Sequence, residues 1–345
     1  MTHVTLRVNE QALVRHLKLG FTSQTTVLGE LTQNARRAKA SVVIFDYDEA
    51  LGRLTVTDDG SGIDDLQVLL TVAESGWDAE TVAQEHPFGL GFLSAVYAAE
   101  RLTVESRGRR LCFATADLLA FRPLEVLAAD TACGTRLVLE GLQIPFLEAA
   151  LRHRARGFPI EVRFNGEPLP RPDALDGGRP FEPTAVGRIH LYGLHPDEDW
   201  RAMRGDELIC YLQGLPVFQS GHYGAQATVV HLDSARFCAR LPDRDKLIEE
   251  TEVLQAVRAE VQALAQGRLR ELQAQLSPES FVQRYASSIG AWSGSSTRCP
   301  LCPGSFWHAS RTTPRSRAGR MTGSSAWRHR CHALPSRGCG ATGAP

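Results

Sequence analysis

Two glycines separated by one residue stand at the start of an apolar helical stretch, and this placement constrains the fold more than any other feature. The stretch is HPFGLGFLSAVYAAE, residues 86–100. Glycine costs a helix backbone entropy. A pair at this point is therefore typical of a loop whose backbone N–H groups approach an anion at a helix N-terminus. Most glycine-rich turns before helices bind nothing, so an anion site needs further motifs elsewhere in the chain.

The order of the expected elements favours an α+β fold. From the N-terminus the patterns predict two helical pieces in 10–40, strands 41–47 and 53–58 joined by a hairpin turn, a short helix 65–74, a loop 75–88, a helix 89–99, and strands in 101–116 and 134–142. Regular βαβ alternation is missing from this order. We expect an α/β sandwich whose mixed or antiparallel sheet is covered on one face.

The pattern restarts near residue 150. A strand, an Asn-Gly turn and a second strand occupy 158–169, further strand candidates follow, and 247–276 forms a long amphipathic helical stretch. The sequence therefore predicts three regions: a first domain over 1–150, a smaller α+β domain with a C-terminal helix over 151–285, and a tail over 286–345. The tail is rich in Ser, Gly, Arg and Pro and lacks periodicity, which predicts disorder.

Composition narrows the class of protein. The chain is 43% hydrophobic and 22% charged, as in a globular protein. It contains no apolar run long enough to span a membrane and no signal-peptide layout at its start, so we expect a cytoplasmic protein without a membrane partner. The segment 291–345 holds eight Arg and no Asp, Glu or Lys, so the net charge of −1 hides a value of −9 over residues 1–290. An acidic body argues against nucleic acid as a partner.

Two further short motifs could carry chemistry. Glu30 and Asn34 stand at i and i+4 on an expected helix, so their side chains share one face. The amide oxygen of Asn34 could ligate Mg²⁺, and the Glu30 carboxylate could orient an attacking water. Asp58 ends a strand and could accept a hydrogen bond from an exocyclic amine, while Gly60 and Gly62 let the backbone pass close to a ring. Each motif alone is more often a solvated polar face or an Asp-Gly turn.

Together, in this order and in these contexts, the three motifs resemble the nucleotide site of the GHKL ATPase superfamily. That superfamily comprises gyrase, the ninety-kilodalton heat-shock chaperones, histidine kinases and MutL. FGLGFLSAVYAAE is most similar to the corresponding motif of the HtpG chaperone branch. ESGW (74–77) stands where that branch has a Ser-Gly lid segment, and FPIEVRFNGE resembles the entry to its middle domain. The resemblance implies a Bergerat-type ATP-binding sandwich followed by a transducer-like domain.

The resemblance also implies roles for individual residues. Glu30 would be the general base, and Asn34 the Mg²⁺ ligand. The remaining nucleotide contacts would come from Ala38, Asp58, Gly60, Gly62, Gly89, Gly91, Phe92 and Thr135. Arg244, in the stretch Asp-Arg-Asp-Lys-Leu, would reach the γ-phosphate, with Lys246 as the alternative cation. A salt-bridged helix start explains this last stretch equally well.

The chain also departs from the chaperone pattern. Arg37 stands where the chaperones usually have Asp, and the lid segment 63–87 is short. The expected function is a Mg²⁺-dependent ATPase that drives a conformational change in a protein client, with an ATP-dependent homodimer as a further partner. Two alternatives stay open: a nucleotide-gated binding module with little turnover, and a DNA-processing ATPase resembling MutL or gyrase.

The tail offers a candidate zinc site. Cys299 and Cys302 form a C-x-x-C pair, and Cys331 and Cys339 follow at a spacing that is not standard for zinc. The alternative is that the tail is a frameshifted reading of a GC-rich gene, because it loses all acidic residues abruptly.

Overall fold

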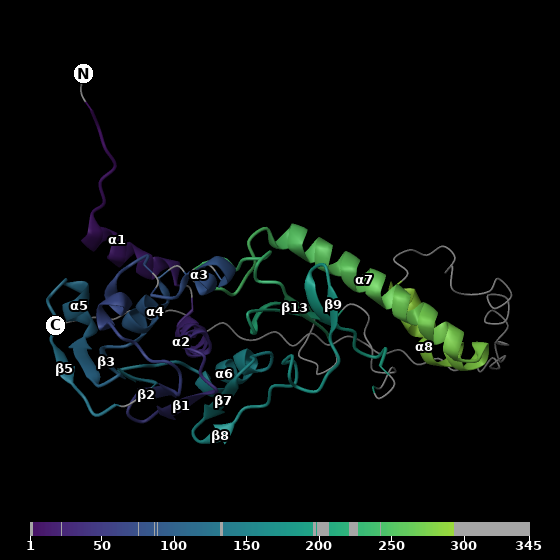
Figure 1. Cartoon of the computed structure of the whole chain (residues 1–345), viewed down its shortest axis with the longest axis horizontal. Helices are drawn as coiled ribbons and strands as arrows, with labels where there is room; N and C mark the ends of the chain where they lie inside the picture. The colour runs from purple at the N-terminus through teal and green to yellow at the C-terminus, as the bar shows by residue number, and fades with distance from the viewer. Residues whose placement is uncertain are drawn as a thin grey trace, which may run out of the picture. The chain divides into compact units, whose positions relative to one another are not determined.

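The first part of the chain builds an eight-stranded sheet (Figure 1). The computed structural model describes residues 3–292, except 22, 75, 86, 88, 132–133, 196–197, 199–206, 221–226 and 242. The strand order is β5-β4-β3-β6-β2-β1-β7-β8. The bounds are β1 Val42–Asp48, β2 Arg53–Asp58, β3 Arg101–Ser106, β4 Arg109–Ala114, β5 Val126–Ala128, β6 Thr135–Glu140, β7 Glu161–Phe164 and β8 Glu167–Pro168. The strands pair antiparallel except β1 with β7, so the sheet is mixed.

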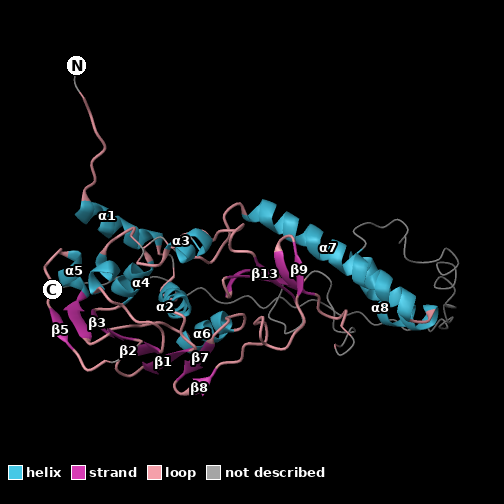
Figure 2. Cartoon of the chain, in the orientation of Figure 1, coloured by secondary structure: helices cyan, strands magenta, loops and turns pink. Residues whose placement is uncertain are grey.

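Helices cover one face of this sheet (Figure 2). Their bounds are α1 Glu10–Leu17, α2 Thr26–Arg37, α3 Ala79–Glu85, α4 Gly91–Ala98, α5 Thr115–Leu119 and α6 Leu147–Ala155. Burial alternates along the central strands, as expected for a sheet with one covered face. Phe45 and Leu54 from that face pack into one core with Leu28 of α2 and Val96 of α4. The predicted α+β class with a singly covered mixed sheet is confirmed.

Of two local predictions in the segment between β2 and α4, the short helix is present over a shorter span and the loop was wrong. The expected helix 65–74 is a 3-10 helix over Leu66–Leu70, and the expected loop 75–88 contains α3. Both begin after an aspartate that caps them: Asp65 accepts a hydrogen bond from the Gln67 N–H at 2.9 Å, and Asp78 from the Thr81 N–H at 2.8 Å. Such Asp caps are a local helix-start signal.

A second sheet of five strands follows, in the order β12-β11-β13-β10-β9. The bounds are β9 Glu182–Thr184, β10 Gly187–His190, β11 Leu208–Leu212, β12 Leu215–Gln219 and β13 Thr228–Leu232. β11 and β13 are buried along their whole length and pair in parallel. The long helix α7, Glu250–Gln275, runs beside this sheet, and its Glu260 accepts a hydrogen bond from the Ala185 N–H in the β9–β10 turn.

The last described helix, α8, spans Pro278–Trp292. It passes residue 286, the predicted start of the tail, because Phe281 and Tyr285 bury one apolar face one helical turn apart. The rest of the predicted tail lies outside the described residues. The domain division at residue 150 stays a prediction, and β7 and β8, which follow it, complete the first sheet. Among the described helices, none combines the length and apolar character needed to cross a bilayer.

Candidate functional site

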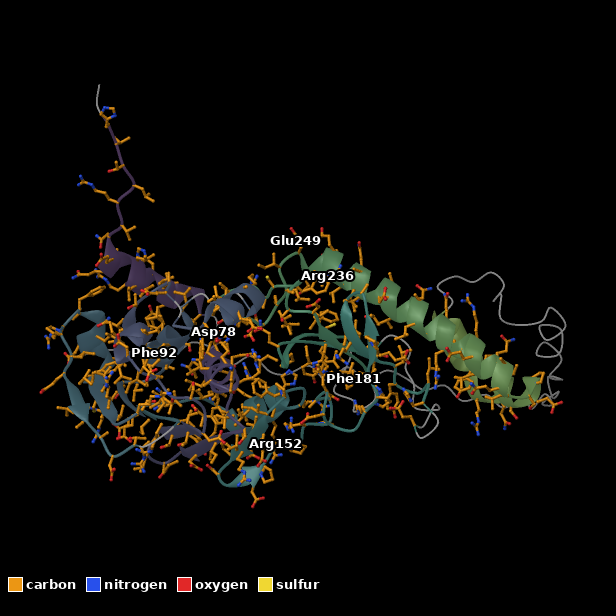
Figure 3. The ribbon with its side chains drawn as sticks, viewed as in Figure 1. Asp78, Phe92, Arg152, Phe181, Arg236 and Glu249 are labelled. Carbon is orange, nitrogen blue, oxygen red and sulfur yellow. The ribbon has the colours of Figure 1, made fainter. Side chains whose placement is uncertain are left out.

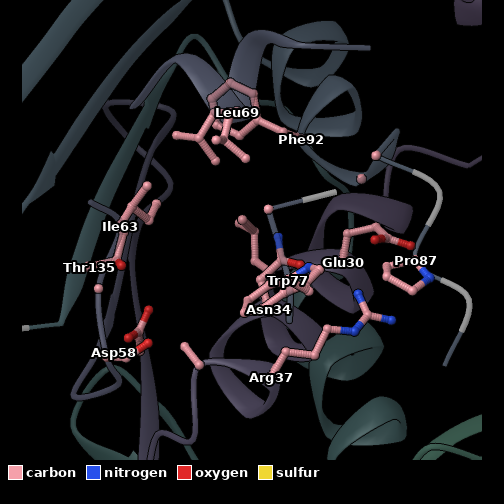
Figure 4. Close-up of a pocket in the computed structure, with 18 of the residues that line it drawn as sticks. Glu30, Asn34, Arg37, Asp58, Ile63, Leu69, Trp77, Pro87, Phe92 and Thr135 are labelled. Atoms are coloured by element: carbon pink, nitrogen blue, oxygen red, sulfur yellow. The ribbon is translucent and has the colours of Figure 1, made fainter. Parts of the chain in front are cut away.

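A cavity of about 550 Å³ opens between α2, the loop after β2, the segment 63–78 and the start of α4 (Figure 4). This volume lies within the usual range for small-molecule sites. Ten of the eleven predicted site residues line it: Glu30, Asn34, Ala38, Asp58, Gly62, Gly89, Gly91, Phe92, Thr135 and Arg244. The eleventh, Gly60, lies directly behind Ala38. The three motifs, which are far apart in sequence, therefore meet around one cavity.

One end of the cavity is formed by the end of β2. Asp58 pairs in register with Thr135 of β6, and its Oδ1 accepts a hydrogen bond from the Gly60 N–H at 2.9 Å. Burial raises the pKa of Asp58, while hydrogen bonds from the Gly60 and Thr135 backbones lower it in part. Its neighbour Asp59 instead accepts from the Ser41 N–H at 2.8 Å. The fold thus gives Asp59 a structural bond and leaves Asp58 beside the cavity.

Gly60 lets the loop after β2 touch the end of α2. A Cβ atom at this position would stand 2.7 Å from the Cβ of Ala38 and 2.8 Å from its carbonyl oxygen. The next residue, Ser61, donates its backbone N–H to that same carbonyl at 2.8 Å. Only glycine fits this approach, so Gly60 places Ala38 in the wall without lining the cavity itself.

The opposite end of the cavity is formed by α2 and the start of α4. Glu30 is only 4% exposed, and its Oε1 accepts from Nε of Arg244 at 2.8 Å. Its Oε2 faces Gly91, where a Cβ atom would collide with it. Asn34, one turn along α2, lines the same end. No side chain caps α4, the Leu93 N–H of its first turn donates to the Leu90 carbonyl at 3.1 Å, and the Gly91 end of the helix lies next to Glu30.

Arg244 and the alternative cation Lys246 end up in different places. Arg244 is brought against Glu30 across 214 residues of sequence, in the left-handed backbone region at φ +52°. Lys246 is exposed and does not line the cavity. The structure therefore brings only Arg244 to the predicted site.

Sequence reasoning missed a second ion-pair group beside the cavity. Glu85, the last residue of α3, accepts from Arg36 Nη2 at 2.5 Å and from Arg37 Nε at 2.8 Å. The turn between β11 and β12 joins this group, because Gln213 accepts from Gln33 Nε2 at 3.0 Å and donates to the Glu85 carbonyl at 3.4 Å. No local pattern marks Glu85 as a partner of α2, because its segment was expected to be a loop and its partners lie 49 and 48 residues earlier in the chain.

Sequence reasoning also missed the apolar wall. Ile63, Leu69 and Trp77 line the cavity with Phe92, and Figure 4 shows Ile63 on the Thr135 side and Leu69 beside Phe92. These side chains could pack on a flat apolar ring that presents an amine to Asp58. Leu69 lies in the segment 65–74, which was expected to be a short helix, and Trp77 lies in the expected loop 75–88, so neither was predicted to line a site.

Two metal sites were predicted, one for Mg²⁺ at Asn34 and one for zinc in the tail. The described residues hold no group of three or more His, Cys, Asp or Glu side chains that could bind a metal ion by themselves. Asn34 offers one amide oxygen, which suits a Mg²⁺ ion that arrives with phosphate oxygens and keeps several waters. The predicted zinc ligands Cys299, Cys302, Cys331 and Cys339 lie outside the described residues.

Comparison with known proteins gives a distant similarity of fold. No protein-family model matches the chain, and no curated protein matches it. Among solved structures, the chain is similar to the ATPase region of Saccharomyces cerevisiae topoisomerase II at 11% identity, with a TM-score of 0.41. The same region bound to ICRF-187 (dexrazoxane) is similar at 11% identity with a TM-score of 0.39. Each alignment covers 56% of this chain and 62% of the topoisomerase region. These similarities do not support the predicted assignment to the HtpG branch.

Proposed function

We propose that this chain binds ATP in the cavity and hydrolyses it, as a member of the GHKL superfamily. The observation that carries the proposal is the convergence of the three motifs around one space of about 550 Å³: Asp58 at one end, and Glu30 with Asn34 and the glycines before α4 at the other. A carboxylate placed to accept from an amine, separated by an apolar wall from a carboxylate beside the N-terminus of α4, suits a nucleotide that lies along the cavity.

In this proposal one end of the cavity binds adenine and the other end binds the phosphates. Asp58, supported by Thr135, accepts the adenine amine, and the ring lies against Ala38, Gly62 and Ile63. The N–H groups of Gly89, Gly91 and Phe92 bind phosphate oxygens at the start of α4. Glu30 orients the attacking water and accepts its proton. Asn34 would ligate a Mg²⁺ ion, which would neutralise phosphate charge.

The ion pair between Arg244 and Glu30 gives the cycle a resting state. While Arg244 occupies Oε1 of Glu30 at 2.8 Å, that carboxylate has less freedom to accept a proton. A γ-phosphate offers Arg244 a second anion, so we propose that triphosphate binding draws Arg244 to the phosphate and frees Glu30. The candidate targets of the ATPase cycle are a protein client, a second copy of the chain and DNA. A DNA-processing function fits the cavity no worse than a chaperone function.

The same ion pair favours a second candidate, the nucleotide-gated binding module. If Arg244 stays on Glu30 after ATP binds, the chain would bind nucleotide and hydrolyse almost none. Binding and turnover therefore have to be measured on the same preparations.

The test compares wild type with Glu30→Ala and the isosteric Glu30→Gln, in Mg²⁺, with ATP affinity measured on each. We expect both substitutions to lower turnover by about 10²- to 10⁴-fold without weakening ATP binding, because they remove the anion that competes with the γ-phosphate for Arg244. Glu148→Ala, which alters an exposed carboxylate of α6, is the matched control for a contaminating ATPase. Binding without turnover in all four proteins would select the gated module, and absence of binding in wild type would overturn the nucleotide assignment.

A further inference from the structure

Five charged side chains gather at the Glu30 end of the cavity, and we call them the cavity cluster: Glu30, Arg36, Arg37, Glu85 and Arg244. Three guanidinium groups share two carboxylates. Arg244 bonds Glu30, and both Arg36 and Arg37 bond the single Oε2 atom of Glu85. The cluster is therefore short of one negative charge.

Within the cavity cluster, Arg37 is the arginine whose hydrogen bonds are least complete. Its side chain is 2% exposed, and its Nη2 atom has no hydrogen-bond partner within the described part of the chain. Burial lowers the pKa of Arg37, and the nearby charge of Arg244 lowers it further, against the opposing effect of Glu85. A buried guanidinium with an unused donor is costly unless another anion completes it.

The position of Arg37 says where such an anion would lie. Arg37 lines the cavity together with Glu30 and Asn34. In Figure 4 its guanidinium lies toward Glu30 and Pro87, on the far side of the cavity from Asp58. Its neighbour Arg36 bonds the same Glu85 oxygen but does not line the cavity. The unused donor thus belongs to the end of the site that the proposed function assigns to phosphate.

Resting on the proposed function, we propose that Arg37 is a further phosphate-binding residue and that Glu85 is the anion a triphosphate replaces on it. Guanidinium binds phosphate through paired N–H donors, so Nη2 and the Nε now held by Glu85 can serve one phosphate group. In this chain a buried cation from α2 thereby adds to the backbone N–H groups of α4.

The experiment measures the affinities of ATP, ADP, adenosine and inorganic tripolyphosphate for wild type, Arg37→Gln, Arg36→Gln and Glu85→Gln by calorimetry. We expect Arg37→Gln to weaken ATP binding by about 10- to 100-fold and to leave adenosine within about threefold. The matched control Arg36→Gln should leave ATP affinity within about threefold, because Arg36 lies outside the cavity. Glu85→Gln should tighten ATP binding severalfold, because it removes the competing anion.

Folding is checked separately. Arg37→Gln removes a buried charge that lacks full compensation, so its melting temperature should not fall. Arg37→Lys keeps the charge without the paired donors and should recover part of the lost ATP affinity. An unfolded Arg37→Gln would leave Arg37→Lys and Glu85→Gln to decide, because a phosphate role requires a weaker Kd in the first and a tighter Kd in the second.

The outcomes separate this proposal from the proposed function. Equal weakening of ATP and adenosine in Arg37→Gln would mean that Arg37 only supports the fold, and unchanged ATP affinity would overturn its phosphate role outright. If wild type binds tripolyphosphate but neither ATP nor adenosine, the nucleotide assignment fails, and loss of tripolyphosphate binding in Arg37→Gln still supports the role of Arg37. If wild type binds none of the four ligands, both proposals fail.

Discussion

Two groups of buried charge in this molecule both pair arginines with carboxylates, but their hydrogen bonds are completed to different degrees. In the Asp173 cluster, Asp173 is 1% exposed and accepts from Arg156 at 2.9 Å, Arg179 at 2.8 Å and the Tyr211 hydroxyl at 2.7 Å. In the cavity cluster, Arg37 shares one carboxylate oxygen and keeps an unused donor.

The arginines of the two clusters respond in opposite directions. Burial alone would lower the pKa of Arg156, but Asp173 outweighs it and raises that pKa above its ordinary value. The more deeply buried Arg37 has its pKa lowered, because burial and Arg244 outweigh Glu85. Buried charged groups that serve only the fold are generally fully paired, whereas strongly perturbed charged groups beside a cavity cluster at functional sites. This difference separates the structural cluster from the candidate site.

The largest expected effect breaks the structural cluster. Asp173→Asn leaves Arg156 and Arg179 without their buried anion, so the free energy of unfolding should fall by about 3–5 kcal/mol in urea denaturation. The matched control is Asp176→Asn, which alters an exposed carboxylate that bonds Arg171 at 3.0 Å. It should cost less than about 1 kcal/mol. Similar losses from both would mean that the Asp173 cluster is no more structural than a surface ion pair.

The next largest effect is expected from the same Asp-to-Asn substitution in the candidate site. Asp58→Asn should weaken ATP binding by about 10- to 100-fold, because the amide presents a donor as well as an acceptor to the adenine amine. The free protein should lose no stability at neutral pH, because an ionised carboxylate beside the cavity is exchanged for a neutral group. Its neighbour is the control: Asp59→Asn should lower stability, since Asp59 holds the start of β1.

The pH dependence of stability follows from the same carboxylate. Burial raises the pKa of Asp58, so the folded state binds the proton more tightly than the unfolded state does. The contribution of Asp58 to stability should therefore decline as the pH rises from about 4, the ordinary value, through the raised pKa of the folded protein. Urea denaturation across this range should show the decline in wild type, and its persistence in Asp58→Asn would assign it to another group.

The smallest effect is expected for an exposed ion pair, which gives the reference stability change against which both clusters are compared. The exposed pair Arg152 and Glu148 of α6 lies at 2.7 Å and i,i+4 spacing, with both side chains about half exposed. Glu148→Ala should change the free energy of unfolding by less than about 0.5 kcal/mol, because solvent screens such pairs. A loss above about 1 kcal/mol in urea denaturation would show that exposed pairs contribute more here than the comparison assumes.

Sequence patterns alone located most of the elements and the polar residues at the two ends of the cavity, but not its apolar wall. The i,i+4 spacing of Glu30 and Asn34, the strand that ends at Asp58 and the glycines before α4 are local signals, and each lies within one element. Residue spacing shows which side chains share one face of an element. In each of these three elements that face lies toward the cavity. The missed helix α3 also had a local signal, the cap at Asp78, but its short length hid the periodicity.

Only the tertiary structure decided how distant segments complete the site. It placed Arg244 rather than Lys246 on Glu30, joined Glu85 to Arg36 and Arg37 across more than 40 residues, and added β7 to the first sheet beside β1. These contacts depend on how α2, α3 and the second sheet pack, and no pattern within one segment encodes its partner. The sequence by itself therefore determined which residues could carry nucleotide chemistry, while long-range packing decided which of the buried charges are fully paired and which keep an unused donor.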